Sequence, residues 1–527
     1  MPISTFAQAP LRRRFRWIRL LSLVGGFMLP SVAQPQPSPT IPTFHWVYTY
    51  LDELHLRQPG LDFDPARLPL TALEIDSLRR MMAGSRGSSG ERFWYRRIKE
   101  YGAHFGRPGM ASAGFLLQEK LGRFASDELR SRLALRPQLT LAVNRRLLLF
   151  NSIRLDQELN DDPAYLGKKW RQFSGYTEQA YAMWRFGRGA LKFGRDFVVW
   201  GRGHDASLLL SDAARPLDLI SFDLAMGRLR FSYVVAKLDA VEVPDSLRST
   251  LGAATAPRYV AANRWSYSFL HNKLRLAISQ AVLYGGPGQQ IEWSFLNPFI
   301  FLHGEVLNGP VDANSFGSVE IVVRPQPRLE FYGHLLVDDV QIEKTGAGDL
   351  EPSEIGYMAG GRIADPLGFG ATTFGLEYTR VANRTYNSPD EFTKFLHRRQ
   401  PLGHFLGNDF DRWLIFGSGY LGGALALNWE LELRRRGEGR IDAPFDTPWI
   451  HSTLTKGYAE KFPGGVVEKG LLTRVELRWH PRTSVMLSLC LGHSRFDDYK
   501  NLSGIKKNIS EIYLRGWFEF DTFLHAD

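Results

Sequence analysis

The chain beyond residue 110 alternates regularly between apolar and polar side chains. Between residues 424 and 434 the apolar positions are Leu425, Leu427, Trp429, Leu431 and Leu433. The same period of two recurs near residues 275, 487 and 514. This period predicts β-strands with one apolar face. A sandwich of two sheets has the same local pattern, so the connections between the strands must distinguish the folds.

The predicted connections alternate between tight turns and long loops. We expect eight tight turns, at 136–138, 187–189, 226–228, 271–272, 325–327, 365–369, 417–423 and 481–482. Nine further connections, all long except the first, fall at about 122–127, 151–177, 199–217, 239–258, 284–315, 338–354, 381–411, 435–470 and 494–509. Seventeen connections join eighteen strands, and both ends of the sheet then lie on the tight-turn side. These features predict an all-β transmembrane fold, an eighteen-stranded antiparallel outer-membrane barrel.

The region before the strands has a helical period instead. Thr71 and Glu74 have the spacing of a capping box, and apolar residues at helical intervals follow them. A second helix is predicted over about 91–105. We therefore expect residues 44–108 to form a small periplasmic helical subdomain, and residues 109–527 to form the barrel with its long extracellular loops.

The first residues predict export from the cytoplasm. Five arginines between Arg12 and Arg19 precede an apolar stretch, and Ser31-Val32-Ala33 resembles a cleavage site. Residues 1–33 are thus predicted to be a cleaved signal peptide, with a Pro-rich tether at 34–43. Its removal leaves 60 basic against 55 acidic residues, so the net charge falls from +10 to +5. We expect a place in the outer membrane of a Gram-negative bacterium, with membrane lipid and the barrel-assembly machinery as partners.

Composition excludes several other classes of protein. A single cysteine, Cys490, excludes a disulfide scaffold and a cysteine-based metal cluster. The mean hydropathy of −0.22 and the lack of a long apolar run argue against a polytopic helical membrane protein. No basic stripe survives signal cleavage, so nucleic acid is not an expected partner. No cofactor or metal is predicted.

The densest polar and aromatic stretch lies at residues 193–212. Its candidate polysaccharide-binding residues are Arg195, Asp196, Trp200, Arg202, His204 and Asp205. Aromatic faces beside arginine and carboxylate groups suit sugars, which they bind by stacking and by bidentate hydrogen bonds. We expect a glycine-bent strand end that directs these side chains to the barrel mouth. The alternative is a structural network of salt bridges that braces the wall.

A second polar and aromatic stretch lies at residues 284–315, and we expect it to fold inward and constrict the lumen. Its candidate binding residues are Asn297, His303, Glu305, Asn308 and Asp312. His303 and Glu305 lack the spacing of a helical zinc-protease motif, which argues against metal catalysis. Ser207 and Ser211 lie near His204, but the G-x-S-x-G motif of serine hydrolases is absent. No catalytic residue is predicted.

Several stretches together resemble the Wzi family of capsule-assembly outer-membrane proteins. They are residues 194–212, 296–305, 308–312 and 351–357, and the resemblance extends from about Phe44 to Phe520. It implies a lectin-like, non-enzymatic barrel with a small periplasmic helical part that helps to attach capsular polysaccharide or exopolysaccharide to the cell surface. The alternatives are a channel for small solutes or saccharides, and a hydrolase built into the barrel wall.

Overall fold

The computed structural model describes residues 37–524, except 59, 83–86, 103–110, 125–127, 166, 244, 342–344, 347, 367 and 423. These described residues belong to one compact unit. The predicted signal peptide lies outside the described residues.

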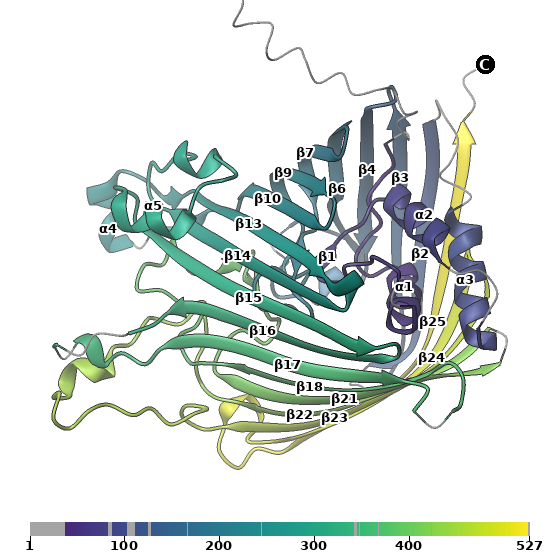
Figure 1. Ribbon diagram of the computed structural model, residues 1–527. Helices are drawn as coiled ribbons and strands as arrows, with labels where there is room; N and C mark the ends of the chain where they lie inside the picture. The colour runs from purple at the N-terminus through teal and green to yellow at the C-terminus, as the bar shows by residue number, and fades with distance from the viewer. Residues whose placement is uncertain are drawn as a thin grey trace, which may run out of the picture. The chain divides into compact units, whose positions relative to one another are not determined.

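Among the described residues, eighteen antiparallel strands form a closed barrel wall, as predicted (Figure 1). In chain order they are β2 (Ala111–Phe124), β3 (Leu129–Ala142), β4 (Leu147–Asp156), β6 (Phe173–Phe186), β7 (Gly189–Asp196), β9 (Leu217–Met226), β10 (Leu229–Lys237), β13 (Arg258–Phe269), β14 (Leu274–Gly285), β15 (Ala313–Gln326), β16 (Leu329–Asp339), β17 (Glu354–Ala364), β18 (Thr372–Val381), β21 (Phe410–Gly422), β22 (Leu425–Arg436), β23 (Glu468–Arg482), β24 (Val485–Asp497) and β25 (Lys507–Leu524). Pairing of β2 with β25 closes the sheet, so the wall has no free edge.

The remaining strands are two residues long. β5 (Lys169–Trp170) extends the wall at β6. Three further pairs are β1 (Arg67–Leu68) with β8 (Val199–Trp200), β11 (Val241–Glu242) with β12 (Thr255–Ala256), and β19 (Leu396–His397) with β20 (Gln400–Pro401).

The alternation of tight turns and long loops is confirmed, with one turn misplaced. Residues 136–138 do not form a turn, because β3 continues through them and Pro137 lies opposite Phe115. On its other side the β3–β4 ladder is interrupted between Leu135 and Gln138. Proline has no N–H to donate to that ladder, which explains how it is accommodated in mid-strand. The turn itself follows Ala142.

The two faces of the wall differ as the alternation predicts. In β14, Leu276 and Ile278 are exposed on one face, whereas Arg275 and Ser279 are buried on the other. Buried charged side chains from many strands point inward, and exposed apolar side chains point outward. This is the distribution expected when hydrocarbon surrounds the barrel.

Three helices occupy the tight-turn end of the barrel: α1 (Trp46–Arg57), α2 (Ala72–Met81) and α3 (Ser89–Gly102) (Figure 1). The predicted capping box is present at α2, where Thr71 and Glu74 bond reciprocally. Tyr50 of α1 lies 2.7 Å from His480 Nδ1 on β23. The short helices α4 (Asp245–Leu251) and α5 (Leu302–Asn308) lie at the long-loop end (Figure 1). No helix among the described residues is long and apolar enough to cross a bilayer.

Two chain segments from the long-loop end fill much of the lumen. One is residues 197–216 between β7 and β9, here called the lumen-crossing segment, and the other is residues 382–409 between β18 and β21. Both contribute to one apolar core with inward side chains of the wall. Its members include Trp200, Leu208, Tyr386, Phe395, Leu402, Val260, Phe316 and Leu336.

Candidate functional site

The lumen-crossing segment begins with a sharp bend at Gly201. This glycine has a φ of +135°, and a Cβ added there would lie 2.2 Å from Ser207 Oγ, so only glycine fits. The bend directs Arg202 across the lumen, where its Nη2 lies 2.9 Å from Glu330 and 3.2 Å from Asp52. Its backbone N–H donates to Glu320 at 2.8 Å. Arg202 is buried, and its charge is balanced within the protein.

The same segment reaches the opposite wall through His204 and Asp205. Both nitrogens Nη1 and Nη2 of Arg412 donate to Asp205, at 2.7 and 2.6 Å. The pKa of Asp205 is about 2: burial would raise it, but the bonds from Arg412 outweigh burial. The ring of His204 stacks on Phe416 at 3.7 Å, and its Nε2 lies 3.4 Å from Glu430.

The pKa of His204 is raised from its ordinary value. Burial alone would lower it, but the bond to Glu430 and the nearby carboxylate of Asp205 outweigh burial. The raised pKa favours the protonated ring of His204 beside these two carboxylates.

β7, the strand before the bend, carries two candidate residues, and their side chains point to opposite faces of the wall. Asp196 is fully buried and accepts hydrogen bonds from Gln179 Nε2 at 2.7 Å and from Thr40 Oγ1 at 2.9 Å. Arg195 shares the parity of the exposed Phe193 and therefore lies on the outer face, paired with Asp218 at 2.7 Å. The side chains expected to meet at the mouth thus form the bracing network of the alternative hypothesis, and their role in binding stays a prediction.

The hydroxyls considered for a hydrolase are also engaged within the protein. Ser207 donates to the carbonyl of Trp200, and Ser211 donates to that of Gly403. Both serines are buried. No described group of three or more His, Cys, Asp or Glu side chains is placed to hold a metal ion.

The expectation that the second polar stretch folds inward is wrong. Residues 286–312, here called the outer flap, pack on the outer face of β10, β13 and β14. Arg264 points inward to Asp64, so its neighbours Asn263 and Trp265 point outward, and Asn263 Nδ2 donates to Ile300 of the flap at 3.3 Å. The inward expectation failed because an aromatic loop has the same composition whether it covers the lumen or the wall.

The five candidate residues of the outer flap therefore lie outside the lumen, where they make mostly local contacts. His303 Nδ1 lies 2.7 Å from Ser315 Oγ, and Asn308 Nδ2 donates to Gly304 at 2.7 Å. Asn297 accepts from the backbone N–H of Phe299 at 3.1 Å. Glu305 lies within α5 and Asp312 is exposed just before β15. Their role in polysaccharide binding stays a prediction.

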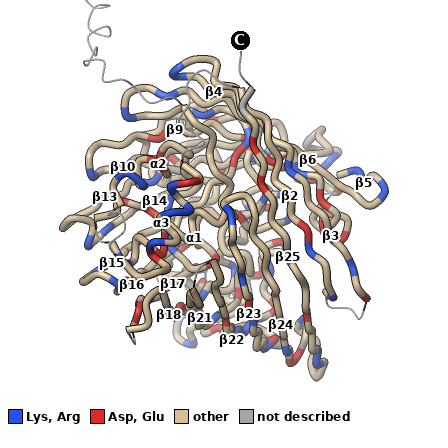
Figure 2. The backbone as a smooth tube through the Cα atoms, turned by 90° about the vertical axis from the view of Figure 1, so that its right-hand side faces the viewer, with Lys and Arg blue, Asp and Glu red and all other residues tan. Residues whose placement is uncertain are grey.

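A polar chamber remains open inside the barrel beside β2, β3, β4 and β6. It consists of three adjoining cavities of about 340, 280 and 230 Å³, all lined by Arg154. We call this space the luminal chamber. The innermost cavity is lined by Phe44, Trp46, Gln118, Lys120, Arg132, Arg136, Asp156, Glu158, Arg478, Met486, Arg515 and Trp517, among others. Figure 2 shows charged positions along β2, β3 and β25, three of the strands that bound it.

Cations outnumber anions in the innermost cavity, and several donors there have no acceptor. Six Lys or Arg side chains line it, against Asp156 and Glu158. Three of the six pair with carboxylates outside the lining: Arg136 with Glu178, and Arg478 and Arg515 with Glu476. The indole N–H groups of Trp46 and Trp517 and the Nε–H of Arg515 have no acceptor among the described residues. Aromatic faces beside cationic donors suit a ligand rich in acceptor oxygens, such as a sugar with acidic groups.

The residues of this chamber differ from those predicted as the site. Of the eleven candidate residues, only Asp205 lines it. Sequence reasoning missed Lys120, Arg132, Arg136 and Arg154 because each is one polar position in an ordinary alternating strand. The sequence feature that could have revealed them is that they lie on consecutive strands, at alternating positions whose side chains point into the barrel.

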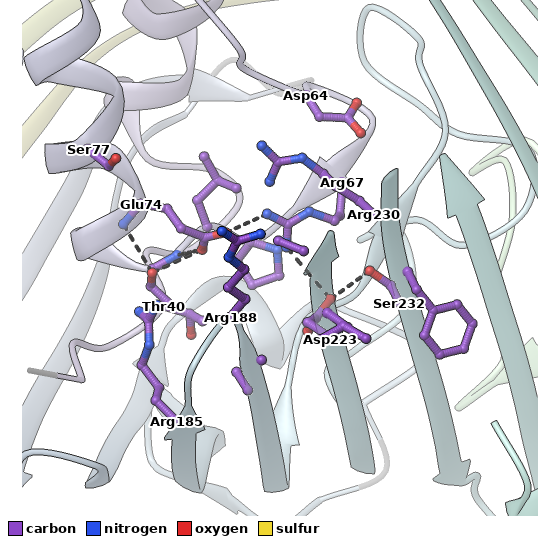
Figure 3. A pocket seen from close by; sticks show the side chains of 18 of the residues that line it. Thr40, Asp64, Arg67, Glu74, Ser77, Arg185, Arg188, Asp223, Arg230 and Ser232 are labelled. Carbon is purple, nitrogen blue, oxygen red and sulfur yellow. Dashed lines mark hydrogen bonds and ion pairs between the residues drawn. The ribbon is translucent and has the colours of Figure 1, made fainter. Parts of the chain in front are cut away.

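A further pocket of about 360 Å³ lies at the tight-turn end, between α2 and strands β6 to β10 (Figure 3). Figure 3 shows Arg67 there with Glu74 and Asp223, to which its distances are 2.5 and 3.7 Å. Arg230 is paired with Asp62 at 2.9 Å. These pairs balance much of the pocket's charge, and the pocket is remote from the long loops.

Comparisons with known proteins agree with this architecture. A search of curated sequences finds no match. Among solved structures, the chain is similar to Wzi of Escherichia coli, an outer membrane protein involved in group 1 capsule assembly and a carbohydrate-binding β-barrel. The identity is 14%, the TM-score is 0.61, and the alignment covers 92% of this chain and 99% of that one. OccD3 of Pseudomonas aeruginosa matches with a TM-score of 0.45 and 9% identity, over 79% of this chain and 93% of that one.

The family comparison is more specific than either structural likeness. The model of the family described as "capsule assembly protein Wzi" matches residues 82–508, which is most of the chain. The matched region includes the lumen-crossing segment, the outer flap and the seventeen wall strands before β25, and it ends at the second residue of β25. The chain therefore belongs to the Wzi family of capsule assembly proteins.

Proposed function

We propose that this protein is a lectin-like, non-enzymatic barrel that binds capsular polysaccharide or exopolysaccharide and helps to attach it to the cell surface. The observation that carries the proposal is the luminal chamber, where Lys and Arg side chains outnumber carboxylates and lie beside aromatic faces. Membership of a capsule assembly family supports it. So does the carbohydrate binding of the E. coli barrel that shares this fold.

The chemistry of the chamber favours the end of an acidic polysaccharide over that of a neutral one. Lys120 and Arg132 lie near Glu158, at 2.8 and 3.6 Å, and Arg132 also pairs with Asp161 at 3.2 Å, so both cations are held at the cavity by carboxylates. A carboxylate or phosphate on a sugar would complete these pairs through charge-assisted hydrogen bonds. The aromatic side chains of Trp46 and Trp517 line the same cavity. A polymer end would enter past Arg215 and Gln400, which line the outermost cavity.

We further propose the cellular setting that this function requires. The protein is exported by its N-terminal signal, folded by the barrel-assembly machinery and embedded in outer-membrane lipid. The long loops then face the outside of the cell, where the polymer is held. The exposed apolar residues on the outer faces of the strands support this placement.

Two neutralising substitutions test the role of the chamber. Lys120→Gln and Arg132→Gln each remove a partly exposed cation that lines it. Each is expected to weaken binding of the producing organism's acidic polysaccharide by about tenfold or more, since a hydrogen bond to a charged group contributes roughly 1.5–3 kcal/mol.

Arg130→Gln is the matched control, because Arg130 lies on the same strand and is paired with Glu128 but does not line the chamber. Its affinity should equal that of the parent. Equal affinity of all three variants would place the binding site elsewhere.

A further inference from the structure

The outer flap covers a part of the wall that would otherwise face lipid with polar side chains. On β13 and β14 the outward residues include Asn263 and Gln280, which lie opposite each other in the register. The flap hydrogen-bonds to both amides: Asn263 Nδ2 donates to Ile300, and Gln280 Oε1 accepts from the backbone N–H of Leu302 at 2.9 Å. An unpaired amide facing hydrocarbon would cost several kcal/mol.

Apolar packing fixes the flap on this face of the wall. Phe295 and Leu302 are buried against the outward side chains Tyr233, Val282 and Tyr284. Tyr233 donates its hydroxyl to the carbonyl of Phe295. At the edge of the flap nearest the tight-turn end of the barrel, Phe299 stacks on Phe231 with ring centroids 5.1 Å apart. The flap thus descends to the level of Phe231, only a few residues from the tight turn that joins β9 to β10.

Large apolar side chains of the flap are exposed, and beside them lie the exposed Asn297 and His303. Trp293 is 82% exposed, Leu307 is 71% exposed and Phe301 is 65% exposed. Residues 286–312 contain neither Lys nor Arg. Large exposed apolar patches on a protein mark an interaction surface.

The apolar surface of the flap is continuous with the lipid-facing rows of the wall. Phe299 lies against Phe231, which pairs in register with Trp265, and Trp265 pairs with the exposed Ile278. Val319 on β15 extends the same row and is also exposed. A surface continuous with the hydrocarbon-facing belt, and with no cation to bind a polyanion, fits acyl chains better than it fits an acidic polysaccharide.

We propose that the outer flap is inserted among the lipids of the outer leaflet, with Trp293, Phe301 and Leu307 packed against acyl chains. The segment can tolerate this environment because helical turns and the wall amides satisfy part of its backbone. The flap then sets how deeply this side of the barrel sits in the leaflet. This proposal is independent of the luminal chamber and of what binds there.

Site-directed spin labelling of the full chain in phosphatidylcholine vesicles tests the insertion. The single buried cysteine is first removed by Cys490→Ser, and a nitroxide is then placed through Phe301→Cys or Leu307→Cys. Ile278→Cys serves as the lipid-facing reference on the wall. Trp170→Cys serves as the reference for an exposed aromatic outside the belt, since Trp170 is 71% exposed at the end of a long loop.

At positions 301 and 307 we expect high collision rates with oxygen and low rates with a water-soluble nickel chelate, as at position 278. Chelate access as high as at position 170 would overturn the proposal. Two other results would also overturn it: spin–spin broadening between copies, which indicates a dimer, or loss of chelate access only after polysaccharide is added, which indicates glycan binding.

A second variant separates this proposal from the proposed function. Phe301→Ser should leave the affinity for polysaccharide unchanged.

Discussion

At the scale of single residues, the inside of the barrel is held together by buried ion pairs. Glu330 is fully buried and accepts hydrogen bonds from Arg202 Nη2 at 2.9 Å and from Arg362 Nε at 3.0 Å. Arg362 also donates to Asp52 of α1, at 2.6 and 2.7 Å. This cluster therefore joins a helix, the lumen-crossing segment and two wall strands.

Glu330→Gln is predicted to be strongly destabilising. The substitution leaves two buried guanidinium groups without their shared carboxylate, which typically costs about 3–5 kcal/mol. Glu128→Gln removes half of an exposed pair with Arg130 and should cost less than about 1 kcal/mol. Urea unfolding of the two variants in detergent measures the difference, and equal losses of stability would argue against the buried cluster.

We predict that the folded protein loses stability in acid because of the buried His404. Burial, reinforced by Arg412, lowers the pKa of this histidine to about 3 in the folded protein, whereas the unfolded value is about 6.5. Between these values the unfolded chain binds more protons, so stability falls as the pH falls, by up to about 1.4 kcal/mol per pH unit.

His404→Gln should make this decline shallower between pH 6 and pH 4. The difference between the variant and the parent at pH 7.5 gives the packing cost alone and serves as the baseline. Parallel declines of the parent and the variant would show that this histidine does not titrate on unfolding.

At the scale of elements, the lumen-crossing segment is the main barrier inside the barrel. Its residues Leu208, Leu209 and Leu210 belong to the core that joins the filling segments to the wall. We predict that replacing residues 203–212 with a short Gly/Ser linker produces large, persistent conductance in planar bilayers. Replacing residues 303–308 of the outer flap, outside the wall, should not. A large open pore in the intact protein would contradict the filled lumen and favour a channel.

The strands were predictable from the sequence because their signal is local. The alternation of Leu425 to Leu433 with polar residues and the parity of turns and loops were enough to count eighteen strands. Pro137 was misinterpreted as a turn. A proline fits in the middle of β3 only because the pairing of β3 with β4 is interrupted there, and the sequence of β3 alone does not show this. The direction of the outer flap was missed for a similar reason: Asn263 and Gln280, the outward amides to which it hydrogen-bonds, lie on other elements.

At the scale of the whole molecule, the candidate site arises only from the assembled fold. Trp46 comes from α1, Arg154 from β4 and Trp517 from β25, and they line one chamber only when the barrel has closed. The sequence indicated aromatic rings beside arginines and carboxylates, a chemistry that the luminal chamber also has, but placed it on the lumen-crossing segment. Burial of those charges depends on contacts such as that of Asp205 with Arg412, 207 positions apart.

The most direct test of the account is the affinity of the folded, detergent-extracted protein for the producing organism's own surface polysaccharide. The measurement compares the native acidic polymer with the same polymer after its carboxyl groups are reduced to alcohols. The luminal chamber predicts saturable binding of the native polymer, weakened about tenfold or more by reduction. Absence of binding, or equal binding of the two polymers, would contradict it.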